Sequence, residues 1–261
     1  MRTILFAMAC LLFKPALHAQ VPIEANPDRS RQRVKTLIEQ LASTNEAPPI
    51  RGNARRGEDQ TIRFPESYDK SRQVLVYSAI QSLLAEEDVA INVLLEHGED
   101  LRYSYSVNSY IDYNVTVGEA CRTIAEAMLI GFENELQVVS RSQFGIFPPP
   151  ESPSKDKPAI DLATYWRMNK NRGSAKFQIE AIDAMLEYFK NADAQREPPW
   201  HPDAQPSPAA EFNRRRDQNI KTLTAIRRMI SETDKRYRTN TIEGAGHCIF
   251  GLPWGSRKFN K

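Results

Sequence analysis

The feature that most constrains the fold is a capped helix start followed by regularly spaced apolar residues, between positions 116 and 132. Thr116 and Glu119 stand three residues apart, so the Thr hydroxyl and the Glu carboxylate can each bind a free backbone N–H group at a helix N-terminus. Apolar side chains then recur in steps of four and three, at Val117, Cys121, Ile124, Met128 and Phe132. The pattern predicts an amphipathic helix ending near Leu136, which must bury one face against other elements.

Six further stretches have helical periodicity, so the chain is predicted to be mainly α, a bundle of about 6–7 helices. They are 28–43, 68–86, 89–97, 160–168, 174–191 and a last helix from Ser207-Pro208 to about Lys235. In the second helix we expect Val74, Tyr77, Leu84 and either Ile80 or Gln81 to share the buried face.

Polar and glycine residues mark the predicted helix ends. Asp88 is expected to cap the helix over 89–97, and Gly98 to end it. Gly173 separates the fourth and fifth of these helices, and Ser174 is expected to be the N-cap of the fifth.

Proline-rich segments separate the helices and predict the domain boundaries. Three consecutive prolines within residues 145–158 favour an extended polyproline II strut, and a second proline-rich connection covers 197–208. We therefore expect an N-terminal helical domain at 20–144, a linker at 145–158, a C-terminal helical segment at 159–236 and an irregular tail at 237–261.

The first 19 residues are typical of a secretion signal. Arg2 is followed by the apolar run Ile4–Phe13, then by Lys14-Pro15 and by Ala19 ahead of the expected cut. Ten residues span about 15 Å as a helix, half the hydrocarbon core of a bilayer, so we expect no transmembrane segment in the mature chain. A secreted or periplasmic location follows. A lipidated Cys10 and an ordinary buried N-terminus are the less favoured alternatives.

The charge of the chain argues against nucleic-acid binding. The full sequence has 35 Lys and Arg against 33 Asp and Glu, and loss of Arg2 and Lys14 with the signal leaves a formally neutral chain. Residues 207–261 nevertheless carry 12 basic and 5 acidic side chains, including Arg214, Arg215 and Arg216. This basic end favours docking on the acidic remainder or plain solvation, while binding to an anionic envelope surface is the alternative.

Two cysteines remain after signal cleavage. Cys121 and Cys248 could form one disulfide in an oxidising compartment. Cys121 also lies on the apolar stripe of the capped helix, so a buried free thiol is the alternative.

Four tyrosines lie close together among serines and asparagines, at Tyr103, Tyr105, Tyr110 and Tyr113. A short hairpin and an ordered loop are both compatible with the partial alternation in this region. Tyrosines suit binding loops, because a ring gives contact area and a hydroxyl at low entropy cost. The alternative is a loop packed onto the helices with its rings buried.

The order of elements from residue 68 to residue 135 resembles a HEAT-type unit, in which antiparallel helix pairs stack and an acidic turn begins the next pair. The resemblance depends on Ala79, Leu83/Leu84, Leu94/Leu95, Asp100 and the helix start at 117–121. It implies a short HEAT-like array acting as a protein-binding scaffold. The tyrosine-rich insert departs from the compact repeat, and no second copy occurs at a clean period.

Candidate catalytic and metal-binding residues are few. No nucleophile elbow, zinc-binding pair or phosphate-binding glycine loop occurs, and His97, His201 and His247 do not form a ligand set, so we expect no cofactor or metal. Glu119, Glu126 and Glu133 repeat every seven residues. Such spacing is typical of a solvated helix face, although a carboxylate-based hydrolase would need residues of this kind.

The sequence therefore favours an exported, non-enzymatic helical protein with a binding or structural role in the cell envelope, with an envelope protein as its partner. A small exported hydrolase that uses carboxylates is one alternative. A binder of anionic surfaces through the arginine-rich last helix is the other.

Overall fold

The computed structural model describes residues 27–49, 64–107, 113–136, 162–191, 209–239 and 242 of the 261-residue chain. Across these ranges the chain forms seven α-helices, two short 3-10 helices and one two-stranded sheet, which confirms the predicted mainly helical class. No helix in the described ranges is both long enough and apolar enough to cross a membrane.

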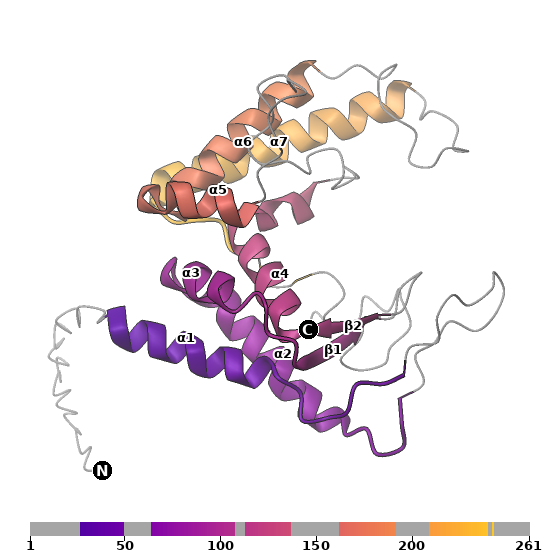
Figure 1. The fold of residues 1–261 in the computed structure, drawn as a ribbon. Coiled ribbons are helices and arrows are strands. Elements are labelled where there is room, and N and C mark those ends of the chain that lie inside the picture. The colour runs from indigo at the N-terminus through magenta and orange to yellow at the C-terminus, as the bar shows by residue number, and fades with distance from the viewer. Residues whose placement is uncertain are drawn as a thin grey trace, which may run out of the picture.

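The N-terminal unit contains four helices and the hairpin (Figure 1). Helix α1 (Pro27–Leu41) packs on α2 (Lys70–Ala85) and α3 (Val89–Glu96), and α3 packs on α4 (Val117–Ile130). The predicted apolar positions of α1 fill the shared core, where Val34, Ile38 and Leu41 are fully buried. The core forms because the apolar surfaces of these helices must be removed from water.

The capped helix forms as its sequence predicts. Thr116 Oγ1 accepts from the backbone N of Glu119 at 3.1 Å, and Glu119 Oε2 accepts from the backbone N of Thr116 at 2.8 Å. All five residues of the stripe are fully buried. The α-helix ends at Ile130 rather than near Leu136, because the chain tightens there into the 3-10 helix η1 (Gly131–Glu135).

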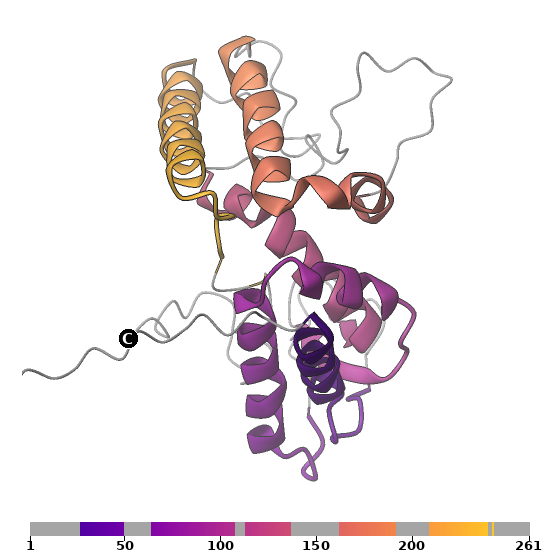
Figure 2. The ribbon, with the colours of Figure 1, turned by 90° about the vertical axis from the view of Figure 1, so that its left-hand side faces the viewer.

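The C-terminal unit is built on α6 (Ser174–Asn191) and α7 (Ala209–Thr233), which run antiparallel side by side (Figure 2). Asp183 of α6 and Arg227 of α7 are linked by an ion pair of 2.5 Å between Oδ1 and Nε. The short helix α5 (Leu162–Asn169) and the 3-10 helix η2 (Lys170–Arg172) lead into α6.

Helix α4 joins the two units, because its lower part lies in the N-terminal unit and η1 reaches α7 (Figures 1 and 2). Phe132, directly after α4, is fully buried in the core between α6 and α7. In the other direction, Trp166 of α5 and Phe177 of α6 are buried in the N-terminal core, with ring centroids 5.9 Å apart. Each core thus includes residues from both sides of the predicted linker. The linker at 145–158 lies outside the described residues, and the division into domains stays a prediction.

The structure corrects the predicted caps of two helices. The Asp88 side chain makes no capping bond to α3, and Ser174 is the first residue of α6 rather than its N-cap. Instead, Asp88 binds the N-terminus of α6 through Ser174. A local pattern cannot show this, because the two residues come together only when the units pack.

Two smaller expectations are also corrected. Val74 is 43% exposed, and the buried face of α2 is formed by Gln73, Val76, Ala79, Ile80, Leu83 and Leu84. Helix α2 is apolar on several sides, so its sequence did not define one face. Gly98 follows α3 without the left-handed backbone of a typical C-terminal glycine, since Gly173 is the sole described glycine with positive φ.

Close packing, rather than backbone conformation, explains one glycine of α4. A Cβ atom at Gly118 would lie 2.4 Å from the backbone oxygen of Gly98. The loop after α3 therefore contacts the first turn of α4 directly, and the backbone N of Gly118 donates to Asp100 O at 2.8 Å.

The tyrosine-rich region contains the hairpin, one of the two predicted alternatives. Strands β1 (Tyr103–Val107) and β2 (Tyr113–Thr116) pair antiparallel. Tyr103 Oη is 2.9 Å from Tyr68 Oη and 2.8 Å from Ser106 Oγ. This chain of hydroxyl groups ties the hairpin to the segment before α2.

The segment after α7 has no regular secondary structure at 235–239, as predicted from residue 237 onward. It contacts both units, because Arg236 donates to Leu84 O and Glu86 O at the end of α2 while Tyr237 is bound by α6. The side chain of Gln178, which is fully buried on α6, binds both the backbone N–H and the backbone oxygen of Tyr237. Its Oε1 accepts from Tyr237 N at 2.6 Å, and its Nε2 donates to Tyr237 O at 3.2 Å. We call residues 235–239 the return segment.

Candidate ligand site at the junction of the two units

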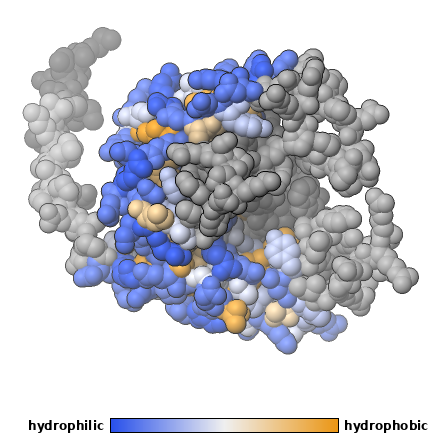
Figure 3. Space-filling view, turned by 45° about the horizontal axis from the view of Figure 1, so that its top comes forward, coloured by the Kyte–Doolittle hydropathy of each residue, from blue (hydrophilic) through white to orange (hydrophobic). Residues whose placement is uncertain are grey.

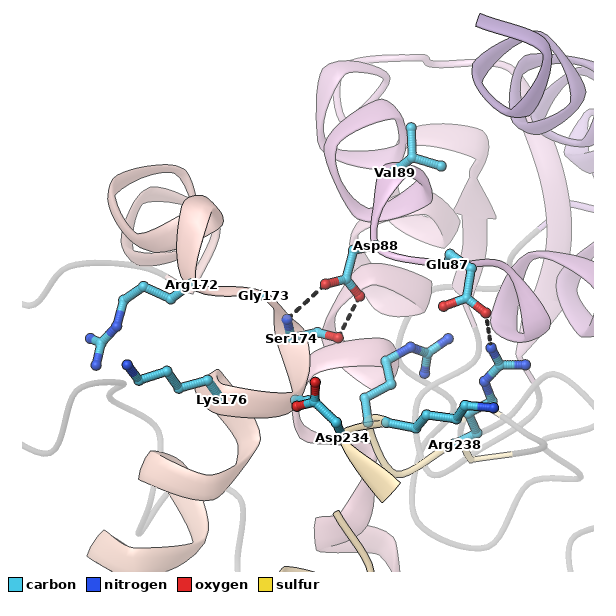
Figure 4. Close-up of a pocket in the computed structure, with 12 residues that line it drawn as sticks. Glu87, Asp88, Val89, Arg172, Gly173, Ser174, Lys176, Asp234 and Arg238 are labelled. Carbon is cyan, nitrogen blue, oxygen red and sulfur yellow. Dashed lines mark hydrogen bonds and ion pairs between the residues drawn. The ribbon is translucent and has the colours of Figure 1, made fainter. Parts of the chain in front are cut away.

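A cavity of about 530 Å³ lies where the two units meet (Figure 4). Three segments far apart in sequence form its wall: 87–89 leading into α3, 172–176 leading from η2 into α6, and the stretch from residue 234 to residue 238 after α7. The volume is within the range of sites that take small molecules.

Asp88 and Ser174 hold two of these segments together (Figure 4). Asp88 Oδ2 accepts from the backbone N of Ser174 at 2.7 Å, and Oδ1 accepts from the Ser174 hydroxyl. The carboxylate thus satisfies a free N–H group at the positive end of the α6 dipole. Gly173 turns the chain into α6 with φ of +78°, a conformation that glycine adopts without a steric penalty.

Arg236 is the most unusual residue in the cavity wall. It is 5% exposed, and its Nη2 donates to the backbone oxygens of Leu84 and Glu86, at 2.8 Å each. Its Nε and Nη1 are buried without a hydrogen-bond partner among the described residues. Burial lowers the pKa of the guanidinium, and the positive charge of Arg238 lowers it further. Arginine stays charged under these conditions, so the group is a buried cation with three unused N–H donors.

Basic side chains outnumber acidic ones around the cavity. Its lining includes five Lys and Arg and three Asp and Glu residues. Two of the arginines are paired, Arg238 with Glu87 and Arg172 with Glu180. Figure 4 shows Arg172 and Lys176 on one side of Ser174, with Glu87 and Arg238 on the other. Lys176 and Lys235 form no ion pair with a described residue.

The predicted tyrosines do not line this cavity. Tyr105 is 2% exposed in the N-terminal core, Tyr103 is half-buried in the hydroxyl chain and Tyr113 is 47% exposed at the hairpin. Tyr110 lies outside the described residues. A tyrosine binding surface therefore stays a prediction. Of the three tyrosines that the structure describes, Tyr113 is the exposed one.

The predicted arginines lie on α7, away from the cavity, and each faces a nearby carboxylate. Arg214 and Arg215 pair with Glu211 at 2.8 and 3.3 Å, and Arg216 pairs with Asp217 at 3.1 Å. The hydrogen bonds that Arg214 donates to Glu211 raise the pKa of Arg214 and lower the pKa of Glu211. These pairs reduce the net positive charge that the helix surface offers to an anionic partner.

The remaining candidates have structural contacts. The Cys121 thiol is fully buried and burial raises its pKa to about 12, while Cys248 lies outside the described residues, so their pairing stays a prediction. His97 Nδ1 is 2.8 Å from Val93 O. Glu119 is engaged in the capping box.

Within the described ranges, no group of three or more His, Cys, Asp or Glu side chains could hold a metal ion. Sequence reasoning missed the cavity residues Asp88, Arg172, Lys176, Lys235 and Arg236 as a site. The one local signal was the basic run Lys235-Arg236-Tyr237-Arg238 directly after the last helix.

The face of the described residues seen in Figure 3 is mainly hydrophilic, with small separate hydrophobic spots. Scattered exposed apolar side chains are normal on soluble domains. No family model, no curated protein and no solved structure matches this chain, so the comparisons give no support to the HEAT-type resemblance.

Proposed function

We propose that the protein is an exported, non-catalytic binding protein that takes a small ligand, or a group of a larger partner, in the junction cavity. The observation that carries this proposal is the cavity itself, with its wall contributed by both helical units. A ligand there would contact the loop before α3, the start of α6 and the return segment together. Binding would therefore stabilise one relative placement of the units.

The location belongs to the same proposal and is supported by the residues before the described part of the chain. The run from Ile4 to Phe13, flanked by Arg2 and Lys14-Pro15, is typical of a cleaved secretion signal. An envelope or extracellular ligand would be the natural occupant of the cavity. N-terminal sequencing of the exported protein is expected to begin at Gln20, and an intact N-terminus at Met1 would contradict export.

The carboxylate hydrolase is less favoured as a proposal, because Glu119 already accepts hydrogen bonds from the Thr116 backbone and hydroxyl. The anionic-surface binder is also less favoured, because Arg214–Arg216 face the carboxylates of Glu211 and Asp217.

The test is equilibrium dialysis of the purified chain against an extract of small molecules, with mass spectrometry of what is retained. Ala175 lines the cavity, so Ala175→Trp is expected to fill it and abolish retention. Met168→Trp is the matched control, since Met168 is 71% exposed on α5 and outside the cavity. Equal retention by the wild type and Ala175→Trp would contradict a ligand site at the junction.

A further inference from the structure

We infer that the group recognised in the junction cavity is an oxyanion, a phosphate or a carboxylate, with Arg236, Lys176 and Lys235 as its binding residues. The inference rests on the proposed function, since it names the ligand class of the same cavity. It depends on three observations: the unused donors of Arg236, the capped N-terminus of α6, and the charge of the cavity wall.

The first observation is the incomplete hydrogen bonding of Arg236. A guanidinium has five N–H donors, and here Nη2 alone is bonded, to Leu84 O and Glu86 O. Leaving a buried charged donor unsatisfied costs free energy, whereas hydrogen bonds between a guanidinium and an oxyanion are among the strongest in proteins. An anion that accepts from Nε or Nη1 would remove this cost.

The second observation is that the α6 N-terminus is already occupied. Asp88 accepts from both the backbone and the hydroxyl of Ser174, and its negative charge disfavours a second anion at this helix end. Recognition must then come from side chains. This is why we assign it to the arginine and the lysines rather than to the helix dipole.

The third observation is the excess of positive charge in the cavity wall. Glu87 is paired with Arg238, whereas Asp88, bonded to Ser174, keeps its negative charge, and both carboxylates attract Arg236. The lining still has five basic against three acidic side chains. Lys176 and Lys235 are exposed at the cavity and form no ion pair with a described residue. The two ammonium groups would attract an anion to the cavity, where the lower dielectric strengthens the contact with the guanidinium.

Anion binding requires the Arg236 side chain to move. Nε and Nη1 of Arg236 have no accessible surface in this structure, so the guanidinium must shift toward the cavity to meet the anion. The backbone beside Arg236 is held by Gln178, which binds Tyr237 N and Tyr237 O, so the shift is one of the side chain alone.

The test is isothermal titration calorimetry of the full chain with inorganic phosphate and, in a separate titration, with citrate. The two titrations distinguish a phosphate ligand from a carboxylate ligand. A neutral disaccharide serves as the negative control. We expect phosphate or citrate to bind, with an affinity that falls as salt rises. The double variant Lys176→Gln/Lys235→Gln is expected to bind about fivefold more weakly, because each lysine contributes at the level of a surface charge pair.

Lys221→Gln is the matched control, because Lys221 is an exposed lysine of α7 outside the cavity. Arg236→Met is expected to reduce the affinity at least about tenfold, by loss of a charged hydrogen bond. If Arg236→Met does not fold, the double variant Lys176→Gln/Lys235→Gln still tests the inference. Binding of neither anion, or equal affinity in the wild type and the double lysine variant, would overturn the inference. A neutral compound retained by the wild type but not by Ala175→Trp would overturn it too, while leaving the proposed function in place.

Discussion

Asp88 Oδ2 accepts a hydrogen bond of 2.7 Å from the backbone N of Ser174, a residue 86 positions later in the chain. The pair joins the residue before α3 to the first residue of α6 (Figure 4). A side chain of the N-terminal unit thereby supplies the cap of a helix in the C-terminal unit.

Replacing Asp88 with alanine should destabilise the protein by about 1–2 kcal/mol, the usual cost of losing a helix cap. Native-state hydrogen exchange should increase in the first turn of α6, because the N–H group of Ser174 loses its acceptor. Asp69→Ala is the control. Asp69 caps its own helix, accepting from Ser71 N at 2.8 Å, so that variant should increase exchange in α2 instead. Unchanged exchange in α6 of Asp88→Ala would contradict the capping contact.

Gly118→Ala should reduce the free energy of unfolding by more than about 2 kcal/mol, at the upper end of overpacking effects. The added Cβ would lie 2.4 Å from Gly98 O, and a backbone atom cannot move aside easily. The matched change Gly98→Ala should be near neutral, since its Cβ would meet its nearest atom at 3.5 Å. Urea unfolding of both variants checks the difference, and similar stability would show that the loop after α3 is not in direct contact with α4.

Glu119→Ala should cost about 1 kcal/mol by removing half of the capping box, while Glu119→Gln should retain most of the stability. Thermal unfolding of the two variants checks this structural role. Full ligand retention by folded Glu119→Gln is also expected, because Glu119 does not line the cavity. A hydrolytic activity that vanished in the folded Gln variant would instead favour the enzyme alternative.

Stability should fall in acid through the carboxylates that bind Arg102. The hydrogen bond from Arg102 lowers the pKa of both Asp100 and Glu39. A carboxylate with a lowered folded-state pKa stabilises the protein above its unfolded pKa of about 4, and this stabilisation is lost as the pH falls through the folded value. The Tm should therefore decrease below about pH 4.

Asp100→Asn should make that decrease shallower, because one of the two linked carboxylates no longer titrates. Arg102→Met is the control: it removes the shared partner, at 2.6 Å from each carboxylate, and should flatten the same limb of the pH profile. An acid limb as steep in Arg102→Met as in the wild type would show that other carboxylates cause it.

The Cys121 thiol should be unreactive in the folded protein. Its pKa is raised to about 12 by burial, so the thiolate that reacts is scarce at pH 8. Labelling with a thiol reagent should be fast only after unfolding in guanidinium chloride. Intact mass before and after reduction reports on the predicted bond to Cys248, and rapid labelling of Cys121 in the native state would contradict its burial.

Much of the fold could be predicted from sequence, because local patterns carry the information. The capping box at Thr116 and Glu119 and the stripe from Val117 to Phe132 are set by residues within one helix, and both occur as predicted. The buried face of α2 was predicted less well. Its apolar residues surround the helix, so only neighbouring elements decide that Val76 is buried and Val74 is 43% exposed.

The candidate site could not be predicted, because its wall comes from three segments far apart in sequence. Arg236 belongs to a segment without periodicity, and its environment comes from the end of α2 and the loop before α3. The tyrosines and the arginine run were conspicuous in sequence for their composition. Composition does not show that Tyr105 is buried. Glu211, by contrast, precedes Arg214 and Arg215 by three and four residues on one helix, so helical spacing indicates these two pairs.

The sequence by itself determined the helices, since spacing, caps and prolines act over a few residues. Only the tertiary structure decided that α4 and η1 together reach both cores, that Asp88 caps α6, and that three distant segments line a cavity beside a buried guanidinium. The physical reason is the separation along the chain between the residues that interact. Helix formation depends on neighbours along the chain, whereas burial, capping across units and the charge of a cavity depend on which surfaces exclude water together.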